Sequence, residues 1–250
     1  MFEMKKFAFL FLLAVFPLSA CGPKESWDYV VIGDNIQLLS TVVSQYAAHI
    51  ERDQGVEIVI FDASEKSTPA SWMLRNMEYH DEFRAAIESA EVITINWPLA
   101  SVDLLESNFI KGECGGADNQ DCLREGYTKA KDDWAGMLNA IASLRNGSPT
   151  IVCILVVGDW VNETGFYGKQ LSSEQIEIFN SYLHDMQDLI IADADARGIP
   201  VLLVFPEPYF NNETPPAEYF QSEGVRLTDS ASKAIADGLR ELGYEPIVLK

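Results

Sequence analysis

The 250-residue sequence is short of histidine and of positive charge. It has three histidines, and 18 lysines and arginines stand against 38 aspartates and glutamates, giving a formal net charge of −20. Phosphate backbones repel so acidic a chain, so we expect no nucleic acid among its partners. The few histidines and cysteines show no spacing of metal ligands, and the acidic segment at 118–121 lacks the full alternating set of oxygens that calcium requires. We therefore expect no metal and no cofactor.

The chain also has no apolar stretch long enough to cross a bilayer with margin. The run FAFLFLLAVFPL at 7–18 follows Lys5 and Lys6 and is typical of the central region of an export signal. It leads into Leu-Ser-Ala-Cys at 18–21, which resembles the lipobox of bacterial lipoproteins. The resemblance implies cleavage before Cys21 and attachment of lipid to its sulfur. An ordinary secretory signal followed by a chance cysteine is the alternative.

The signal and the anchor divide the chain into three parts. We expect a lipoprotein signal peptide at 1–20, a short lipid-anchored tether at 21–26 and a single domain at 27–250, because no linker or low-complexity tract interrupts the remainder. The domain would lie outside the cytoplasm, with the lipid at Cys21 holding it to the membrane of the bacterial cell envelope. Cleavage would remove one acidic and two basic side chains, so the mature chain would be slightly more acidic.

Three cysteines remain after cleavage. Cys114 and Cys122 bracket the short polar segment CGGADNQDC in a compartment that permits oxidation, so we expect a disulfide between them. Cys153 lies inside the apolar run TIVCILVV, which predicts an unreactive thiol in the core.

Short runs rich in valine and isoleucine recur along the domain, at 27–33, 56–62, 90–97, 150–157 and 200–206. Nearly unbroken apolar runs are typical of parallel strands buried on both faces. Segments of helical period separate or follow them, at 37–52, 80–90, 127–145, 172–198 and 228–243. This alternation predicts an α/β fold: a doubly wound, mainly parallel five-stranded sheet with helices on both faces. Such sheets bind ligands beyond the carboxyl ends of their strands.

Two segments at the ends of this pattern resemble a known family. VVIGDNIQLL at 30–39 stands where the SGNH, or GDSL, hydrolases have a Gly-Asp-Ser turn, and SEGVRLTDSASKAIADGLRELGY at 222–244 stands where they have Asp-x-x-His before the last helix. The resemblance implies a three-layer, flavodoxin-like sandwich. It also implies ester hydrolysis by a serine nucleophile, a histidine base with an acidic partner, and donors that bind the oxyanion.

The residues at the catalytic positions differ from those of the family. Asn35 stands at the position of the serine, Arg226 at that of the histidine and Glu223 at that of the acid. Pro98 and Ala100 stand where the glycine and asparagine of the oxyanion hole are expected. An amide is no nucleophile and a guanidinium does not accept a proton at neutral pH, so these positions predict that serine-hydrolase activity is lost.

The sequence supports three hypotheses for function. The first is a pseudo-hydrolase that keeps the SGNH fold and binds an ester, a glycan or another envelope ligand. The second is an active hydrolase with a displaced catalytic set, for example the carboxylates of Asp34, Asp159 and Glu223. The third is an envelope protein-interaction module that presents exposed aromatic side chains such as Trp72.

Three residues that follow strands are expected at the rim of a pocket. Asp34 comes after the first strand, Trp97 ends the third predicted strand, and Trp160 comes soon after the fourth. Tryptophan at these positions can stack on a sugar ring, or it can pack into the core beside the loops, which is its commoner fate.

Overall fold

The computed structural model describes residues 25–33, 36–64, 69–97, 109, 114, 118–157, 172–204 and 227–249; of residues 36–40, 97 and 157 it describes the backbone alone. Within these ranges, no helix is long and apolar enough to span a bilayer. The predicted signal peptide and Cys21 lie outside the described residues.

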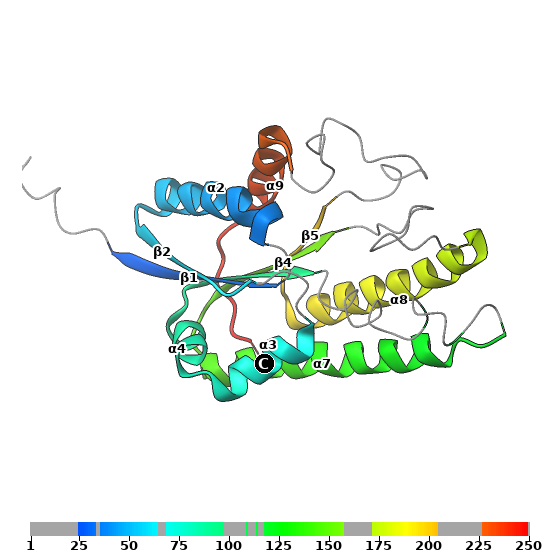
Figure 1. Ribbon diagram of the computed structural model, residues 1–250. Helices are drawn as coiled ribbons and strands as arrows, with labels where there is room; N and C mark the ends of the chain where they lie inside the picture. The colour runs from blue at the N-terminus through cyan, green and yellow to red at the C-terminus, as the bar shows by residue number, and fades with distance from the viewer. Residues whose placement is uncertain are drawn as a thin grey trace, which may run out of the picture.

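The predicted parallel sheet is confirmed. Its order is β2-β1-β3-β4-β5, and every neighbouring pair is parallel. The strands are β1 (Ser26–Gly33), β2 (Glu57–Asp62), β3 (Val92–Trp97), β4 (Ile151–Val157) and β5 (Val201–Val204). Because all five run the same way, their carboxyl ends lie along one side of the sheet, called here the carboxyl edge (Figure 1). Their first residues lie along the opposite side, the amino edge.

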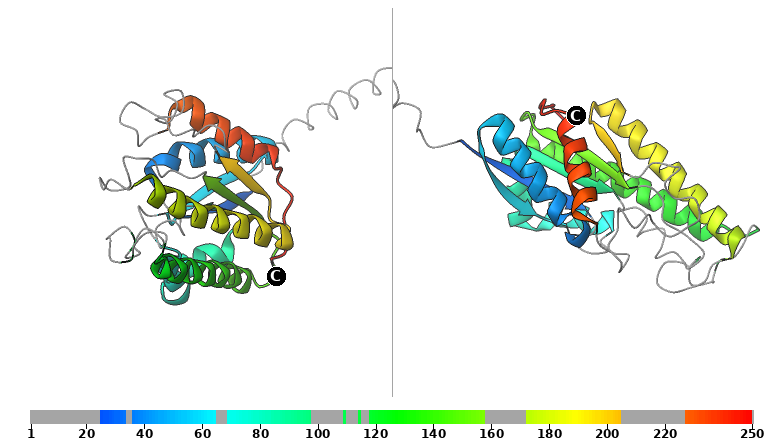
Figure 2. Two further views of the ribbon diagram at one scale, coloured as in Figure 1. Left: turned by 90° about the vertical axis from the view of Figure 1, so that its right-hand side faces the viewer. Right: turned by 90° about the horizontal axis from the view of Figure 1, so that it is seen from above.

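Helices cover both faces of the sheet, which makes the three layers that the sequence predicts (Figure 2). One face carries α2 (Ile36–Gln54) and α9 (Asp229–Glu241), and the other carries α3 (Ala70–Tyr79), α4 (Asp81–Ser89), α7 (Asp121–Arg145) and α8 (Ser173–Arg197). Alternate residues of each central strand enter the two cores. Val30 and Ile32 pack toward α3 and α7, while Tyr29 and Val31 pack toward α2 and α9.

Local signals set the ends of several helices. The Ser172 side chain accepts a hydrogen bond from the backbone N–H of Gln175, whose own side chain accepts one from the backbone N–H of Ser172, so α8 begins with a capping box. Gly198 ends the same helix in the left-handed conformation. Thr228 caps α9 by accepting from the N–H of Ala231, as its place before the helix predicts.

The prediction of an unreactive core thiol at Cys153 is confirmed. Cys153 is buried, and its thiol lies 3.3 Å from the hydroxyl of Thr94, which also accepts a hydrogen bond from the Tyr29 hydroxyl at 3.0 Å. Burial raises the pKa of Cys153 to about 11, so the thiol stays protonated at neutral pH.

Two differences from the sequence-based prediction concern helices. Residues 70–79 form α3, a helix that the sequence analysis did not predict between the strand at 56–62 and the helix at 80–90. The helix α7 begins at Asp121, six residues earlier than predicted, so the disulfide segment leads directly into it. Trp72 lies on α3 and is half-buried against the core, which favours a packing role over an exposed docking role.

Candidate functional site at the carboxyl edge

Gly33 and Asn96 lie opposite each other at the ends of the neighbouring strands β1 and β3. Gly33 has φ of +145°, and a Cβ atom there would lie 2.5 Å from the carbonyl oxygen and 2.7 Å from the Cβ of Asn96. A side chain therefore has no room at position 33, and the backbone conformation also favours glycine. Packing between two strands is enough to require this glycine, whether or not the turn that follows it is catalytic.

Asn96 is a buried polar residue that the sequence analysis did not single out. It is 2% exposed and belongs to the row of β3 side chains that faces α2 and α9. A polar residue within the apolar run VITINW was the available signal, because buried amides need partners and are rare in strand interiors.

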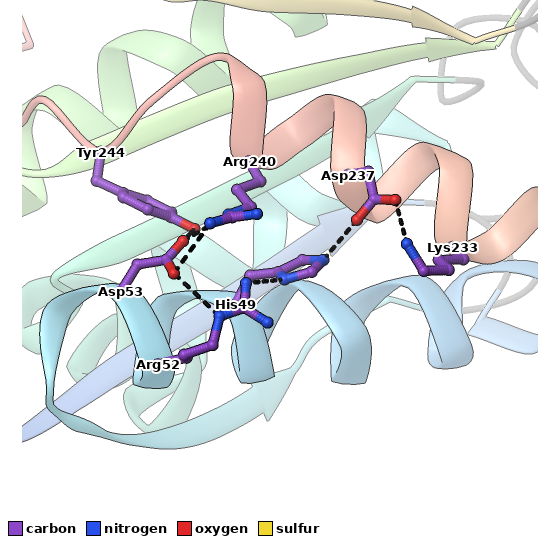
Figure 3. A network of polar contacts seen from close by, with 7 residues as sticks. All are labelled: His49, Arg52, Asp53, Lys233, Asp237, Arg240 and Tyr244. Atoms are coloured by element: carbon purple, nitrogen blue, oxygen red, sulfur yellow. Dashed lines mark hydrogen bonds and ion pairs between the residues drawn. The ribbon is translucent and has the colours of Figure 1, made fainter.

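The described residues that follow the two motif segments lie at the starts of α2 and α9. Position 35 directly precedes α2, and position 226 directly precedes Leu227 and the cap of α9. The two helices pack side by side and run in the same direction. His49 of α2 contacts Asp237 of α9 at 2.9 Å, and Asp53, one turn later, contacts Arg240 at 2.6 Å (Figure 3). Parallel neighbours that end together also begin on the same side, so the starts of α2 and α9 both lie toward the carboxyl edge.

The site residues expected from the sequence lie mostly outside the described part of the chain. Asp34, Asn35, Pro98, Ala100, Asp159, Trp160, Glu223 and Arg226 all fall there, and Trp97 is described by its backbone as the last residue of β3. Their places along the chain are nevertheless bounded by described residues at the ends of β1, β3 and β4 and at the start of α9.

The carboxylate of Asp62, at the end of β2, takes part in a local turn. Its Oδ1 accepts hydrogen bonds from the backbone N–H of Ser64 at 3.0 Å and from the Ser64 hydroxyl at 2.5 Å. Ser64 is buried, so this carboxylate holds the chain where it leaves the sheet.

None of the three histidines directly follows a strand. His49 lies on α2, where Arg52 donates to its Nδ1 at 2.7 Å and its Nε2 faces Asp237 (Figure 3). His80 caps α4 by accepting from the N–H of Phe83, and His184 lies within α8. Each histidine therefore belongs to a helix or its cap, and not to the carboxyl ends of the strands.

The predicted disulfide between Cys114 and Cys122 is confirmed, with a Cα–Cα distance of 6.1 Å. It belongs to a small apolar cluster in which the rings of Phe109 and Phe179 stack with their centres 6.3 Å apart. Leu123 and Leu183 complete its buried part. The cluster joins the connection after β3 to α7 and α8, beside the first turns of both helices.

Three solved structures illustrate what this chain is similar to. The lipase Lip_vut3 from a goat rumen metagenome is 17% identical, with a TM-score of 0.62 over 88% of this chain and 98% of that one. A GDSL-like lipase from Parabacteroides merdae is 12% identical, with a TM-score of 0.52 over 88% and 97%. Axe2, an acetyl-xylooligosaccharide esterase from a Geobacillus species, is 13% identical, with a TM-score of 0.51 over 89% and 96%.

The chain has the SGNH-hydrolase fold. No protein-family model matches the sequence, and no curated protein matches it. At such low identities the likeness establishes the three-layer SGNH architecture over nearly the whole chain, including the parallel sheet whose carboxyl edge was derived above.

Proposed function

We propose that this protein is an extracytoplasmic lipoprotein whose SGNH fold binds a ligand at the carboxyl edge without hydrolysing it. One observation supports the proposal: α2 and α9 pack in parallel, and the described residues Ile36 and Leu227, which directly follow positions 35 and 226 in the sequence, lie at or just before the starts of these two helices. The sequence has Asn35 and Arg226 at these positions, where a serine hydrolase of this fold needs its nucleophile and its base.

The chemistry of ester hydrolysis explains why the residues at these two positions decide whether the protein can hydrolyse an ester. The reaction needs a hydroxyl that attacks the acyl carbon and a base that removes its proton. Asn35 has an amide, and Arg226 has a guanidinium that remains protonated. Loss of the nucleophile or the base in a triad lowers turnover by about 10⁶. The presence of Gly33 in the Gly-Asp turn does not count as evidence for activity, because the contact with Asn96 already requires glycine there.

The residues at the oxyanion-hole positions also support the loss of hydrolytic activity. Pro98 has no backbone N–H, and Ala100 has no side-chain donor, so neither supplies the hydrogen bonds that stabilise a tetrahedral intermediate. A pocket with Arg226 and Glu223 in place of a base and its partner suits recognition of a polar ligand, such as an ester, a glycan or another envelope component.

The anchor is the second part of the proposal. The lipobox resemblance at 18–21 supports lipid attachment at Cys21, and the disulfide between Cys114 and Cys122 suits a protein that folds in an oxidising compartment. The membrane partner would then be engaged through the lipid at residue 21.

A direct assay tests the loss of activity. The mature protein is incubated with short-chain and long-chain activated esters and with a fluorophosphonate label, and a GDSL esterase of known activity is treated in parallel. We expect turnover and labelling at the level of the buffer blank. Turnover well above the blank with no labelling would support the displaced-carboxylate hypothesis instead. Labelling would show a serine nucleophile and overturn the proposal.

A further inference from the structure

The first strand places a strict limit on how the domain can face a membrane. Cys21 and Ser26 are separated by five Cα–Cα steps, which span at most about 18 Å when fully extended. If lipid holds Cys21 at the bilayer surface, Ser26 must remain within about that distance of the surface. Ser26 is the first residue of β1, at the amino edge of the sheet.

The carboxyl edge lies at the opposite end of the same strand. The eight residues of β1 extend about 23 Å from Ser26 to Gly33. The helices reach farther still, because α8 has 25 residues and is about 37 Å long. Figure 1 shows β1 beginning at one end of the molecule and the first turns of α7 and α8 projecting at the other.

The strand register shows that the starting point of β1 lies far toward the amino side. Val201, at the start of β5, pairs with Ile154 of β4. Ile154 pairs in turn with Ile95 of β3, and Ile95 pairs with Ile32 of β1. Ser26 lies six residues before Ile32. Arg197, the last residue of α8, lies four residues before Val201. It therefore lies no farther toward the amino edge than Ser26 does.

From these lengths we infer that the domain stands on its amino edge and holds its carboxyl edge away from the membrane. In the inverted orientation the tips of α7 and α8 would touch the bilayer, and Ser26 would be farther from it than the length of β1, about 23 Å. That distance exceeds the reach of the tether. The inference rests on the lipid anchor proposed above and is independent of whether the site hydrolyses its ligand.

The formal charge of −20 disfavours close contact between the domain and anionic headgroups, whichever side faces them. Glu25, Glu57 and Glu245 are exposed at the amino edge, so these residues give this edge no electrostatic attraction to the bilayer and the tether alone keeps it near the surface.

The orientation narrows the class of ligand. A site on the far side of the domain meets molecules that lie at a distance from the anchoring bilayer, such as soluble compounds or envelope glycans. The acyl chains of that bilayer remain out of its reach. The ligand of the proposed binding function would therefore be a polar molecule outside the membrane, and not a lipid of the leaflet that carries the anchor.

Two serines make a matched pair for the test. Ser148 is exposed in the turn before β4, at the amino edge, and Ser173 is exposed in the first turn of α8, at the projecting tip. Cys153 is buried and Cys114 is bonded to Cys122, so a maleimide dye should label an introduced cysteine selectively. Ser148→Cys and Ser173→Cys are each prepared as the full-length lipidated protein. Both are reconstituted in phosphatidylethanolamine–phosphatidylglycerol vesicles that carry a nitroxide on some headgroups.

Quenching of the dye by the headgroup nitroxide reports the distance of each site from the membrane. We expect quenching to be several-fold stronger at position 148 than at position 173. A second pair, Glu245→Cys at the amino edge and Glu174→Cys at the tip, should show the same order. Equal quenching within the pairs, or stronger quenching at the tip, would overturn the orientation while leaving the anchor and the esterase result untouched. If the full-length protein fails to float with the vesicles, both the anchor and the orientation are wrong.

Discussion

Asp53 and Arg240 form a two-point ion pair between the ends of α2 and α9. The guanidinium Nε lies 2.6 Å from Oδ2 and one terminal nitrogen lies 3.2 Å from Oδ1 of the carboxylate. The Tyr244 hydroxyl donates a third hydrogen bond to Oδ2 at 3.0 Å (Figure 3). These contacts, with the Arg240 hydrogen bond foremost, lower the pKa of Asp53 to about 2.

The ion pair predicts a pH-dependent contribution to stability. Because the pKa is lower in the folded state than the ordinary value of 3.8, the charged form stabilises the fold above about pH 4, and this contribution is lost as the pH falls toward 2. Asp53→Asn should lower Tm at neutral pH by at most about 3 °C, since the pair is near the surface. The difference from the parent should shrink steadily in thermal melts between pH 4 and pH 2. Glu88→Gln, in an exposed pair with Arg84 at 3.9 Å, is the control and should not change Tm.

Gly33 should be far less tolerant of substitution than another glycine of positive φ. Gly33→Ala brings a methyl group into Asn96, whereas Gly55→Ala, at φ of +75°, meets nothing within 4 Å. Gly55→Ala bears left-handed backbone strain of about 1 kcal/mol, and Gly33→Ala, at φ of +145°, bears at least about as much. We expect urea unfolding to show an additional loss of at least about 1–3 kcal/mol for Gly33→Ala, from overpacking. Equal losses in the two variants would mean that strands β1 and β3 separate easily at this point.

Arg145 is a buried cation that binds backbone carbonyls. It is 5% exposed, its Nε donates to the Thr150 hydroxyl at 2.6 Å, and its terminal nitrogens donate to carbonyl oxygens that include those of Ile87 and Glu88 at the end of α4. Arg145→Met would leave these acceptors without donors, and we expect a loss of about 2–4 kcal/mol in urea unfolding. Lys131→Met, exposed on the same helix, should stay within about 0.5 kcal/mol of the parent.

The disulfide should stabilise the domain by restricting a short loop. The two half-cystines are eight residues apart, for which loop entropy predicts about 2–3 kcal/mol. The double variant Cys114→Ser, Cys122→Ser should unfold at lower urea, and the parent treated with a reductant should match it. Alkylation of the unreduced parent followed by intact mass should find both sulfurs blocked. Free thiols at both positions would contradict the bond.

Restoring the two most visible catalytic residues should not restore an efficient esterase. Asn35→Ser with Arg226→His rebuilds a nucleophile and a base, with Glu223 available to orient the base. The oxyanion donors would still be missing at Pro98 and Ala100, and each missing donor costs about 10²–10³-fold in turnover. In steady-state assays on an activated acetate ester, we expect the variant to remain orders of magnitude below an active GDSL esterase. The control Asn35→Ala with Arg226→His should be inactive, and ordinary esterase rates in the serine variant would show that other groups bind the oxyanion.

The sheet was readable from the sequence because its central strands β1, β3 and β4 are buried on both faces, which favours nearly continuous apolar runs. The edge strand β2 has a similar apolar run although most of its residues are exposed, so burial on both faces was wrongly expected there. The helix α3 was missed because its start carries no side-chain cap, and its apolar spacing at Met73 and Met77 is short. Asn96 was missed for a different reason: a polar side chain in a strand becomes meaningful only when its neighbour across the sheet is known. The sequence also predicted the length of α8 but not its projection beyond the sheet, because that depends on where β4 and β5 end.

The pairing of α2 with α9 has a consequence for how the chain acquires its structure. The bond between Asp53 and Arg240 joins residues 187 positions apart. The face of the sheet that α2 and α9 share is therefore fully covered only after the last helix has formed and packed. Closing so long a loop is slow compared with local helix formation. For a chain exported from its N-terminal end, the apolar surface of α2 and β1 would remain open until nearly all of it had crossed the membrane. Truncation before residue 229 should therefore leave this apolar surface exposed and give a species that aggregates.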